Sequence, residues 1–217
     1  MPPVVTFIGC HNSGKTTAAS AVVSYLKEQG FKVGVIKSSS KTQARFDSPD
    51  TDTGKHKLAG ADSVMFAGPD QMVLQTEKTD LSLITLVHRY FSDMDIVIGE
   101  GFKNAKKVPK IEVMRDKKKS LKGQVNGIIA VVTDCGISGD YVFRPHEKEE
   151  IAMFIEKRFL GGGAKAKEKT ALLVNGRKVP INGFIQELLA GSISGMVASL
   201  KAAKKIKHIE IRVELGK

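Results

Sequence analysis

The stretch FIGCHNSGKTTAASAVV, residues 7–23, decides the fold of this chain. Its loop matches the pattern G-x-x-x-x-G-K-[ST], with Gly9 and Gly14 followed by Lys15 and Thr16. A β-branched run at 4–8 precedes the loop, and apolar residues follow it at helical spacing until Gly30, which favours a helix end. The order strand, glycine-rich loop and helix is the one in which this pattern binds phosphate. The stretch therefore predicts a site for a nucleoside triphosphate.

Each residue type in the loop has a physical role in that prediction. Glycines allow backbone N–H groups to curl around a phosphate at the positive end of a helix. The ammonium of Lys15 reaches the β- and γ-phosphates, and the hydroxyl of Thr16 takes a Mg²⁺ position. The loop residues that we expect to contact the nucleotide are Gly9, His11, Asn12, Ser13, Gly14, Lys15, Thr16 and Thr17.

Composition limits the remaining possibilities. The 217 residues suit one medium domain and a smaller unit, and no apolar run is long enough for a membrane span. The two cysteines, Cys10 and Cys135, lie far apart, which fits a reducing cytoplasm. Net charge is +11, with 11 Lys and Arg against four acidic residues after residue 160. Aromatic residues are 6% and do not interleave with this basic tail, so we expect no nucleic-acid partner.

The chain divides at a glycine-rich linker, residues 161–169, into a domain at 1–160 and a second one at 170–217. In the first, strands are predicted at 4–8, 31–37, 63–68, 72–77, 95–100, 110–116 and 127–134. Asp80 is expected to cap a helix whose Leu81, Ile84, Val87, His88 and Phe91 share a face, and YVFRP leads into a helix near 146–159. Apolar strands that alternate with helices predict an α/β domain with a mostly parallel sheet covered by helices, as in P-loop NTPases.

Partners of the loop are expected beyond the carboxyl ends of the strands. Glu100 ends the strand at 95–100 and should hold Mg²⁺ together with Thr16, or orient the attacking water. Gly101 beside it permits a close approach to phosphate. The long polar segment after the second strand suits a switch that responds to the γ-phosphate, with Asp47, Asp50, Asp52 and Thr53 as candidate metal or water contacts.

A set of motifs in a fixed order makes the chain resemble one family. They are GCHNSGKTT, GVIK, Asp52-Thr53 followed by His56 and AGA, EGFK at 100–103, PKIEV at 109–113 and AVVTD at 130–134. Together they resemble the molybdopterin-guanine dinucleotide biosynthesis protein B family, MobB, over roughly residues 3 to 160. The family usually carries histidines where this chain has Ser38, Ser39 and Ser40, so no role of those histidines is transferred.

The resemblance implies a dimeric, weakly active GTPase that uses GTP and Mg²⁺. Its partners would be the molybdopterin guanylyltransferase, molybdenum or tungsten apoenzymes and the anionic molybdopterin. The residues expected to act in catalysis are Lys15, Asp52 and Glu100, with Lys37 and Gly101 at the nucleotide.

Asp134 is the residue expected to read the base. It ends a strand in the second half of the domain, and its carboxylate can accept from the ring N–H and the exocyclic amine of guanine together. No Asn-Lys pair precedes it, and capping of a turn before Gly136 is the alternative.

The tail predicts a small α+β unit. Two alternating runs flank Asn175-Gly176, which indicates a hairpin, and Asn182 is expected to cap a helix. HIEIRVEL, residues 208–215, alternates as a half-buried strand does. Gly191, Gly195 and Ser199 leave a groove on the helix, either for packing within the chain or for another helix or a ligand.

Three other functions remain open on the sequence. A small-molecule kinase shares the loop but normally supplies several arginines, whereas the seven here are scattered. A nickel-insertion GTPase would need Cys or His ligands near the nucleotide, and the five histidines show no such spacing. A non-enzymatic adaptor, in which nucleotide only sets a conformation, would differ in turnover alone.

Overall fold

The computed structural model describes residues 1–39, 47–77, 81–161, 170–175 and 177–200, together with 206, 208–211, 213 and 215. Ten strands and five α-helices are formed by these residues. The strands are β1 Val4–Ile8, β2 Val33–Lys37, β3 Ser63–Ala67, β4 Met72–Thr76, β5 Ile96–Glu100, β6 Lys110–Met114, β7 Ile128–Thr133, β8 Val142–Phe143, β9 Leu172–Val174 and β10 Arg177–Val179. The helices are α1 Lys15–Glu28, α2 Asp52–Leu58, α3 Leu83–Tyr90, α4 Lys148–Phe159 and α5 Gly183–Ala198, with a 3₁₀ turn η1 at Lys117–Lys119.

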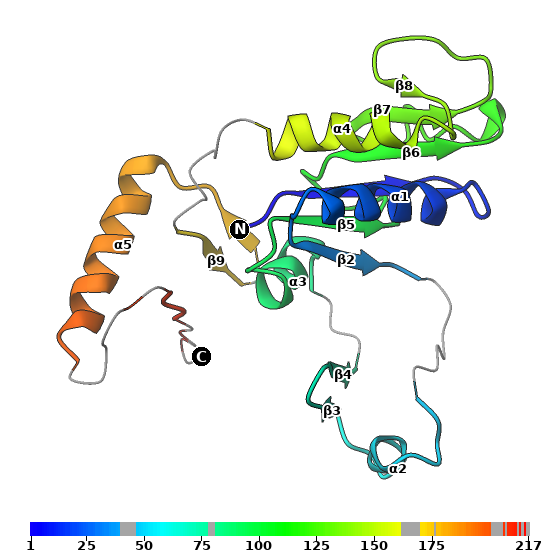
Figure 1. Ribbon diagram of the computed structural model, residues 1–217. Helices are drawn as coiled ribbons and strands as arrows, with labels where there is room; N and C mark the ends of the chain where they lie inside the picture. Colours follow the sequence, from blue (N-terminus) through cyan, green and yellow to red (C-terminus); the bar gives the residue numbers. More distant parts are fainter. Residues whose placement is uncertain are drawn as a thin grey trace.

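Six strands form one parallel sheet in the order β2-β5-β1-β6-β7-β8 (Figure 1). The adjacent strands β5, β1 and β6 are buried except for Glu100. β5 and β1 are largely apolar runs covered on both faces, whereas β6 also buries the charged Lys110 and Glu112. The prediction of a mostly parallel α/β sheet is therefore confirmed.

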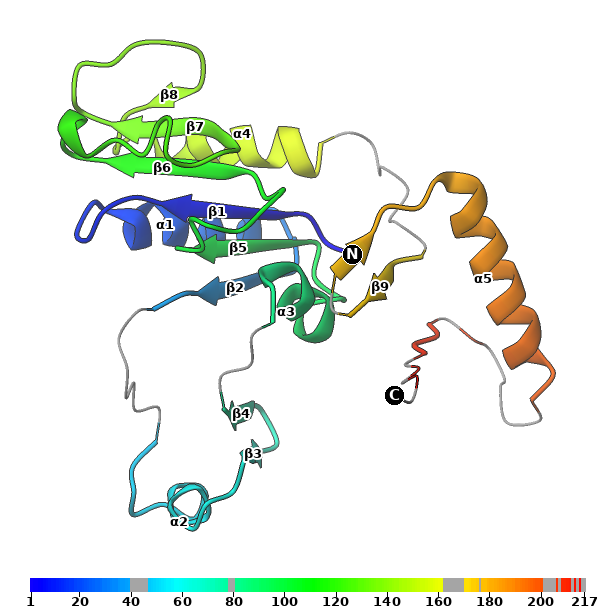
Figure 2. The same cartoon turned by 180° about the vertical axis from the view of Figure 1, so that it is seen from behind.

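Helices cover both faces of this sheet. On one face, α1 and α4 pack against β1, β5, β6 and β7 through a cluster that includes Phe7, Leu26 and Ile155. On the other face, which Figure 2 turns toward the reader, α3 and the crossover from β5 to β6 pack through Val87, Val97 and Val108. The P-loop therefore follows a fully buried strand, β1, at the centre of the sheet.

The cap of α3 differs from the prediction. Ser82 is the N-cap, and its side chain accepts a hydrogen bond from the N–H of Thr85. Asp80 lies outside the described residues. The buried face of α3 is made by Leu83, Thr85 and Val87, so the helix begins two residues later than the sequence pattern placed it.

The segment from 47 to 77 extends away from the sheet. It contains α2 and an antiparallel hairpin of β3 and β4, which lies below β2 in both views (Figures 1 and 2). The two strands were predicted at these residues, but they pair with each other and do not join the main sheet.

The C-terminal unit confirms two of its three predicted parts. β9 and β10 pair as a hairpin, and Asn175 at the turn has φ of 49°, the left-handed conformation that the Asn-Gly pair predicts. Asn182 caps α5 through the N–H of Ile185. The expected strand at 208–215 is not seen: the described residues of that stretch adopt no regular structure.

Candidate nucleotide-binding site

Gly9 and Gly14 shape the P-loop between β1 and α1. Both have positive φ, 145° and 97°, which favours glycine. A Cβ on Gly9 would lie 2.2 Å from the carbonyl oxygen of Val113 on β6, so no other residue fits there without a shift of backbone. The loop is therefore built directly against the end of the neighbouring strand.

The amino end of α1 is open toward this loop. Gly14 occupies the N-cap and offers no side-chain cap, so the first N–H groups of the helix have no side-chain partner at that position. The ammonium of Lys15 donates to the carbonyl of Cys10 across the loop. Ser13 is buried, and its hydroxyl has no hydrogen-bond partner among the described residues. Free donors at a helix amino end and a nearby ammonium fit a phosphate group.

Glu100 lies beside the P-loop, as the sequence predicted. Because β5 is the parallel neighbour of β1, the carboxyl ends of the two strands meet at one edge. The hydroxyl of Thr16 donates to the Glu100 carboxylate, with distances of 2.9 and 3.0 Å to its two oxygens. Lys37, at the end of β2, forms an ion pair with the same carboxylate at 3.0 Å. Three residues from three elements thus form one charged cluster.

The cluster has the chemistry that a magnesium ion requires. Mg²⁺ prefers oxygen ligands, keeps several waters, and is usually held by one or two carboxylates together with substrate phosphates. The hydroxyl of Thr16 and the carboxylate of Glu100 are oxygen donors, and the Glu100 side chain is only 13% exposed. These two residues would hold the ion at the phosphates, where it would neutralise their charge.

Gly101 follows Glu100 with φ of 92°. Its closest neighbour is Ser38, whose Cβ would lie 3.0 Å from a Cβ at Gly101, and the N–H of Ser38 donates to the carbonyl of Glu100 at 2.8 Å. The tight space at Gly101 is therefore made by the chain that leaves β2, and its approach to phosphate stays a prediction.

Asp52 is not brought to the P-loop. It is the first residue of α2, in the segment that extends away from the sheet, and its ion-pair partner is Lys55 at 3.4 Å (Figure 1). Asp47, Asp50 and Thr53 lie in the same segment, where the hydroxyl of Thr53 donates to Asp47. That hydrogen bond is the main reason that the pKa of Asp47 is below its ordinary value. The switch role of these residues stays a prediction.

Asp134 is exposed just after β7, two strands from the P-loop strand. At about 4.8 Å between neighbouring strands, its backbone is on the order of 10 Å along the sheet edge from the end of β1. The described structure gives Asp134 no ion pair, whereas the carbonyl of Thr133 before it accepts from the Arg144 guanidinium at 2.9 Å.

Arg115 is a residue that the sequence reasoning did not single out. It follows β6, the other neighbour of β1, and a Cβ on Gly14 would lie 3.8 Å from its Nη2 atom. A guanidinium therefore lies against the phosphate loop. The arginines look scattered in the sequence, and only the sheet order, which sets β6 beside β1, brings this one to the site.

The amino-terminal part of the chain matches a known family. Residues 4–134 fit the family model of "Molybdopterin guanine dinucleotide synthesis protein B", MobB. The chain belongs to the MobB family. A crystal structure of a molybdopterin-guanine biosynthesis protein B is 30% identical, with a TM-score of 0.60 over 72% of this chain and 98% of that one. The MobB resemblance and the P-loop NTPase fold are both confirmed.

Relatives differ in how much of the chain they share. The Escherichia coli protein named "Molybdopterin-guanine dinucleotide biosynthesis adapter protein" is 31% identical over 54% of this chain and 67% of its own length. A Methanocaldococcus jannaschii protein, also named as a molybdopterin-guanine dinucleotide biosynthesis adapter, is 27% identical over 99% of this chain and 98% of its own. The archaeal match therefore includes the C-terminal unit, which lies beyond the MobB family model.

Proposed function

We propose that this MobB protein is a GTP-binding accessory protein with slow GTP hydrolysis. It would use Mg²⁺ and assist the formation or delivery of the molybdopterin guanine dinucleotide in the cytoplasm. The names of the relatives, which are adapters of molybdopterin-guanine dinucleotide biosynthesis, support the pathway. Their activity is not stated in those names, so nucleotide turnover rests on the site itself.

The cluster of Thr16, Glu100 and Lys37 carries this proposal. A triphosphate in the P-loop would place its β- and γ-phosphates at Lys15, next to the hydroxyl of Thr16. The hydroxyl of Thr16 and the carboxylate of Glu100, which lie 2.9 Å apart, would hold Mg²⁺, and the ion would neutralise phosphate charge. Glu100 would hold the metal or orient water, and Lys37 would balance the carboxylate charge.

The position of Arg115 favours GTP hydrolysis over nucleotide binding without turnover. Its guanidinium is exposed and lies against the P-loop, and the described structure shows no ion pair for it. A guanidinium near transferred phosphoryl groups stabilises the charge that develops on them. Arg115 lies on the β6 side of the loop, and the Glu100 cluster lies on the β5 side. We therefore expect GTP turnover to be slow while Arg115 keeps this position.

We propose guanine as the base and Asp134 as its reader. A nucleotide that extends from the P-loop along the carboxyl edge of the sheet, over β6, would reach the end of β7. A carboxylate there accepts two hydrogen bonds from guanine, and adenine offers no matching pair of donors.

The proposed partners are the molybdopterin guanylyltransferase, molybdenum or tungsten apoenzymes, anionic molybdopterin and a second copy of the chain. The hairpin of β3 and β4 supports dimerisation, because it leaves large apolar side chains exposed: Met65, Phe66, Met72, Val73 and Leu74. Successive residues of a strand alternate, so these side chains lie on both faces of the hairpin, and exposed apolar surface of this kind is typical of protein contacts.

Titration of the full chain with GTP·Mg²⁺ and ATP·Mg²⁺ by calorimetry tests the proposal. Lys15→Ala should weaken GTP binding by about 2 kcal/mol or more, because a charge-assisted contact is lost. Lys148→Ala, at an exposed lysine on α4, is the matched control and should bind as the parent does. Equal affinity of Lys15→Ala and parent would contradict the nucleotide site, and a preference for ATP would contradict the base.

A further inference from the structure

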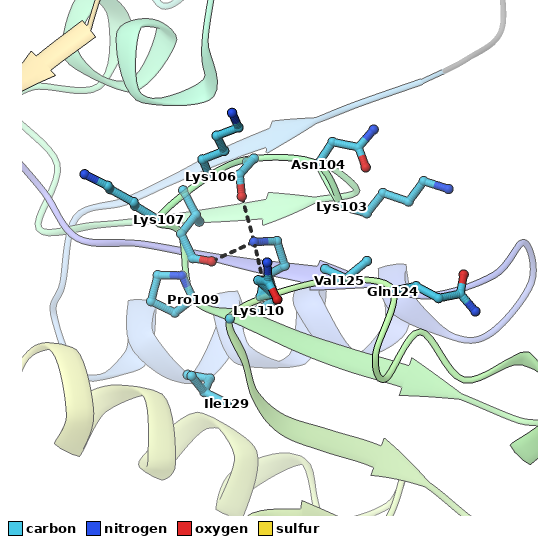
Figure 3. A pocket seen from close by; sticks show the side chains of 13 residues that line it. Lys103, Asn104, Lys106, Lys107, Pro109, Lys110, Gln124, Val125 and Ile129 are labelled. Atoms are coloured by element: carbon cyan, nitrogen blue, oxygen red, sulfur yellow. Dashed lines mark hydrogen bonds between the residues drawn. The ribbon is translucent and has the colours of Figure 1, made fainter.

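A second pocket lies at the amino ends of β6 and β7. Its volume is about 620 Å³, within the range of small-molecule sites. One wall is the crossover at 103–110, which leads from β5 into β6, and the other is the turn at 124–127 before β7 (Figure 3). Apolar side chains of Val108, Val125 and Ile129 share the lining with the amides of Asn104, Gln124 and Asn126.

The charge of this pocket has one sign. Four lysines line it, namely Lys103, Lys106, Lys107 and Lys110, and its lining residues include no Asp or Glu. The first three are exposed, and none of them forms an ion pair within the described part of the chain. Several uncompensated ammonium groups around one cavity attract an anion.

Lys110 fixes the walls of the pocket. It is 2% exposed, and its ammonium donates to the carbonyls of Ala105 at 2.7 Å, Val108 at 2.9 Å and Asn126 at 3.0 Å (Figure 3). These three bonds use all its donors and tie the crossover to the opposite turn. Burial lowers the pKa of Lys110, which is the expected effect of removing an ammonium from water. Because the donors of Lys110 are used within the protein, the exposed lysines are left to contact a ligand.

The backbone of the crossover is held in an uncommon conformation. Phe102 and Lys107 both have φ of 57°, a left-handed value that is strained for a non-glycine residue. Gly127 in the facing turn has φ of 84°, and a Cβ there would lie 3.1 Å from the carbonyl of Val108. The two walls are thus in close contact and preorganised.

The pocket is separate from the P-loop. Lys110 lies at its floor, whereas Val113, three residues further along β6, contacts Gly9. Three residues of a strand span about 10 Å, and the P-loop lies at the carboxyl end of β1, whereas the pocket lies at the amino ends of β6 and β7. A nucleotide at Lys15 and a ligand in this pocket would therefore occupy different sites.

We propose that this lysine pocket binds a small organic phosphate, at a site additional to the nucleotide site. The amides and apolar walls would hold the organic part, and the ammonium groups of Lys103, Lys106 and Lys107 would bind the phosphate. Within the proposed function, a phosphorylated pterin is a ligand of this class; that identification rests on the proposed function, whereas the anion site does not.

The test is a fluorescence titration of the full chain with 6-hydroxymethylpterin phosphate, with the unphosphorylated alcohol as the uncharged probe. Lys15→Ala is present in every sample, so that the P-loop does not compete for the phosphate. We expect the phosphate to bind at least tenfold more tightly than the alcohol. Adding Lys106→Glu and Lys107→Glu should lower that affinity at least tenfold, with an unchanged unfolding temperature.

The matched control is Lys148→Glu with Lys157→Glu, two exposed lysines of α4 outside the pocket lining, which carries the same change in charge and should bind within twofold of the parent. Equal losses in both pairs would overturn the proposal, because net charge alone would then explain binding. Binding of the alcohol as tight as the phosphate would overturn it too, and so would displacement of the probe by a duplex oligonucleotide at lower concentration.

With Lys15 intact, GTP affinity should not respond to the Lys106 and Lys107 changes, which separates this site from the nucleotide proposal.

Discussion

The sheet domain and the C-terminal unit differ in how far they bury their apolar side chains. In the sheet domain, β1 is buried along its whole length, and Phe7 is fully inaccessible to solvent. In the C-terminal unit, α5 has 16 residues and none of them is buried; Phe184 is 71% exposed and Leu188 is 52% exposed. Apart from the helix's own backbone and the adjoining residues, no described atom lies within 4 Å of a Cβ placed on Gly191 or Gly195, so the groove expected on α5 has no occupant among the described residues.

This contrast teaches where stability comes from in this chain. A helix is stabilised mainly by burying one face, so α1 and α4 draw stability from the sheet, whereas α5 has only a half-buried face and a cap at Asn182. β10 contacts α3, and the hairpin is the link between the two parts. Figures 1 and 2 show α5 beyond the amino ends of the strands, and the P-loop lies at their carboxyl ends. The contrast predicts that substitutions in the two parts have very different effects.

The largest expected effect is on folding. Phe7→Ala should lower the free energy of unfolding by about 3–5 kcal/mol, because it removes a fully buried ring from the centre of the sheet. Phe184→Ala removes the same ring from an exposed position and should change it by less than about 0.5 kcal/mol. Urea denaturation of both variants measures the difference. Equal losses would mean that α5 is buried in the protein in solution, against a partner or a second copy.

The next effect concerns the choice of base within the sheet domain. Asp134→Asn should shift preference from GTP toward xanthosine triphosphate by about 2–3 kcal/mol, because xanthine replaces the exocyclic amine by a carbonyl that an amide can match. Competition binding with the two nucleotides measures the shift. If the variant prefers GTP as strongly as the parent, Asp134 caps the turn before Gly136 and does not read the base.

Glu100→Gln should separate hydrolysis from binding. We expect about a tenfold or greater loss of turnover, equivalent to about 1.4 kcal/mol or more, with GTP affinity nearly unchanged. The amide keeps a hydrogen-bond acceptor for Thr16 but loses the charge that pairs with Lys37 and would hold Mg²⁺. Phosphate release under saturating GTP measures turnover. Unchanged turnover would leave Glu100 as a strand-end carboxylate only, and an absence of turnover in the parent would favour the adaptor function.

The smallest effect is expected from removing the C-terminal unit. A chain that ends at Leu160 should fold and bind GTP within about twofold of the full chain, since α5 buries no residue on the sheet domain. Calorimetry and urea denaturation of the shortened chain are the measurements. Loss of folding would show that the hairpin contact with α3 is part of one common core.

Partner binding should be lost on truncation, because the exposed apolar residues of α5 are the surface that the unit offers.

The sequence by itself determined the local parts of this protein. Gly9, Gly14, Lys15 and Thr16 encode the P-loop because each type has one geometric role, and the apolar run at 96–99 predicted that Glu100 ends a buried strand. Asn175 and Asn182 likewise marked the hairpin turn and the α5 cap, since turns and caps depend on neighbouring backbone groups. Ser82 was missed as a cap in favour of Asp80, because several residues near a helix start can accept the same hydrogen bond.

Only the tertiary structure decided which residues of distant segments meet. The order β2-β5-β1-β6-β7-β8 joins Lys37 and Glu100 to Thr16 and brings Arg115 to Gly14. The same order creates the lysine pocket, in which the buried ammonium of Lys110 ties the crossover to the turn before β7. Asp52 lies on α2, outside the six-stranded sheet and its site. Strand order follows from the packing of whole faces, which no short motif encodes.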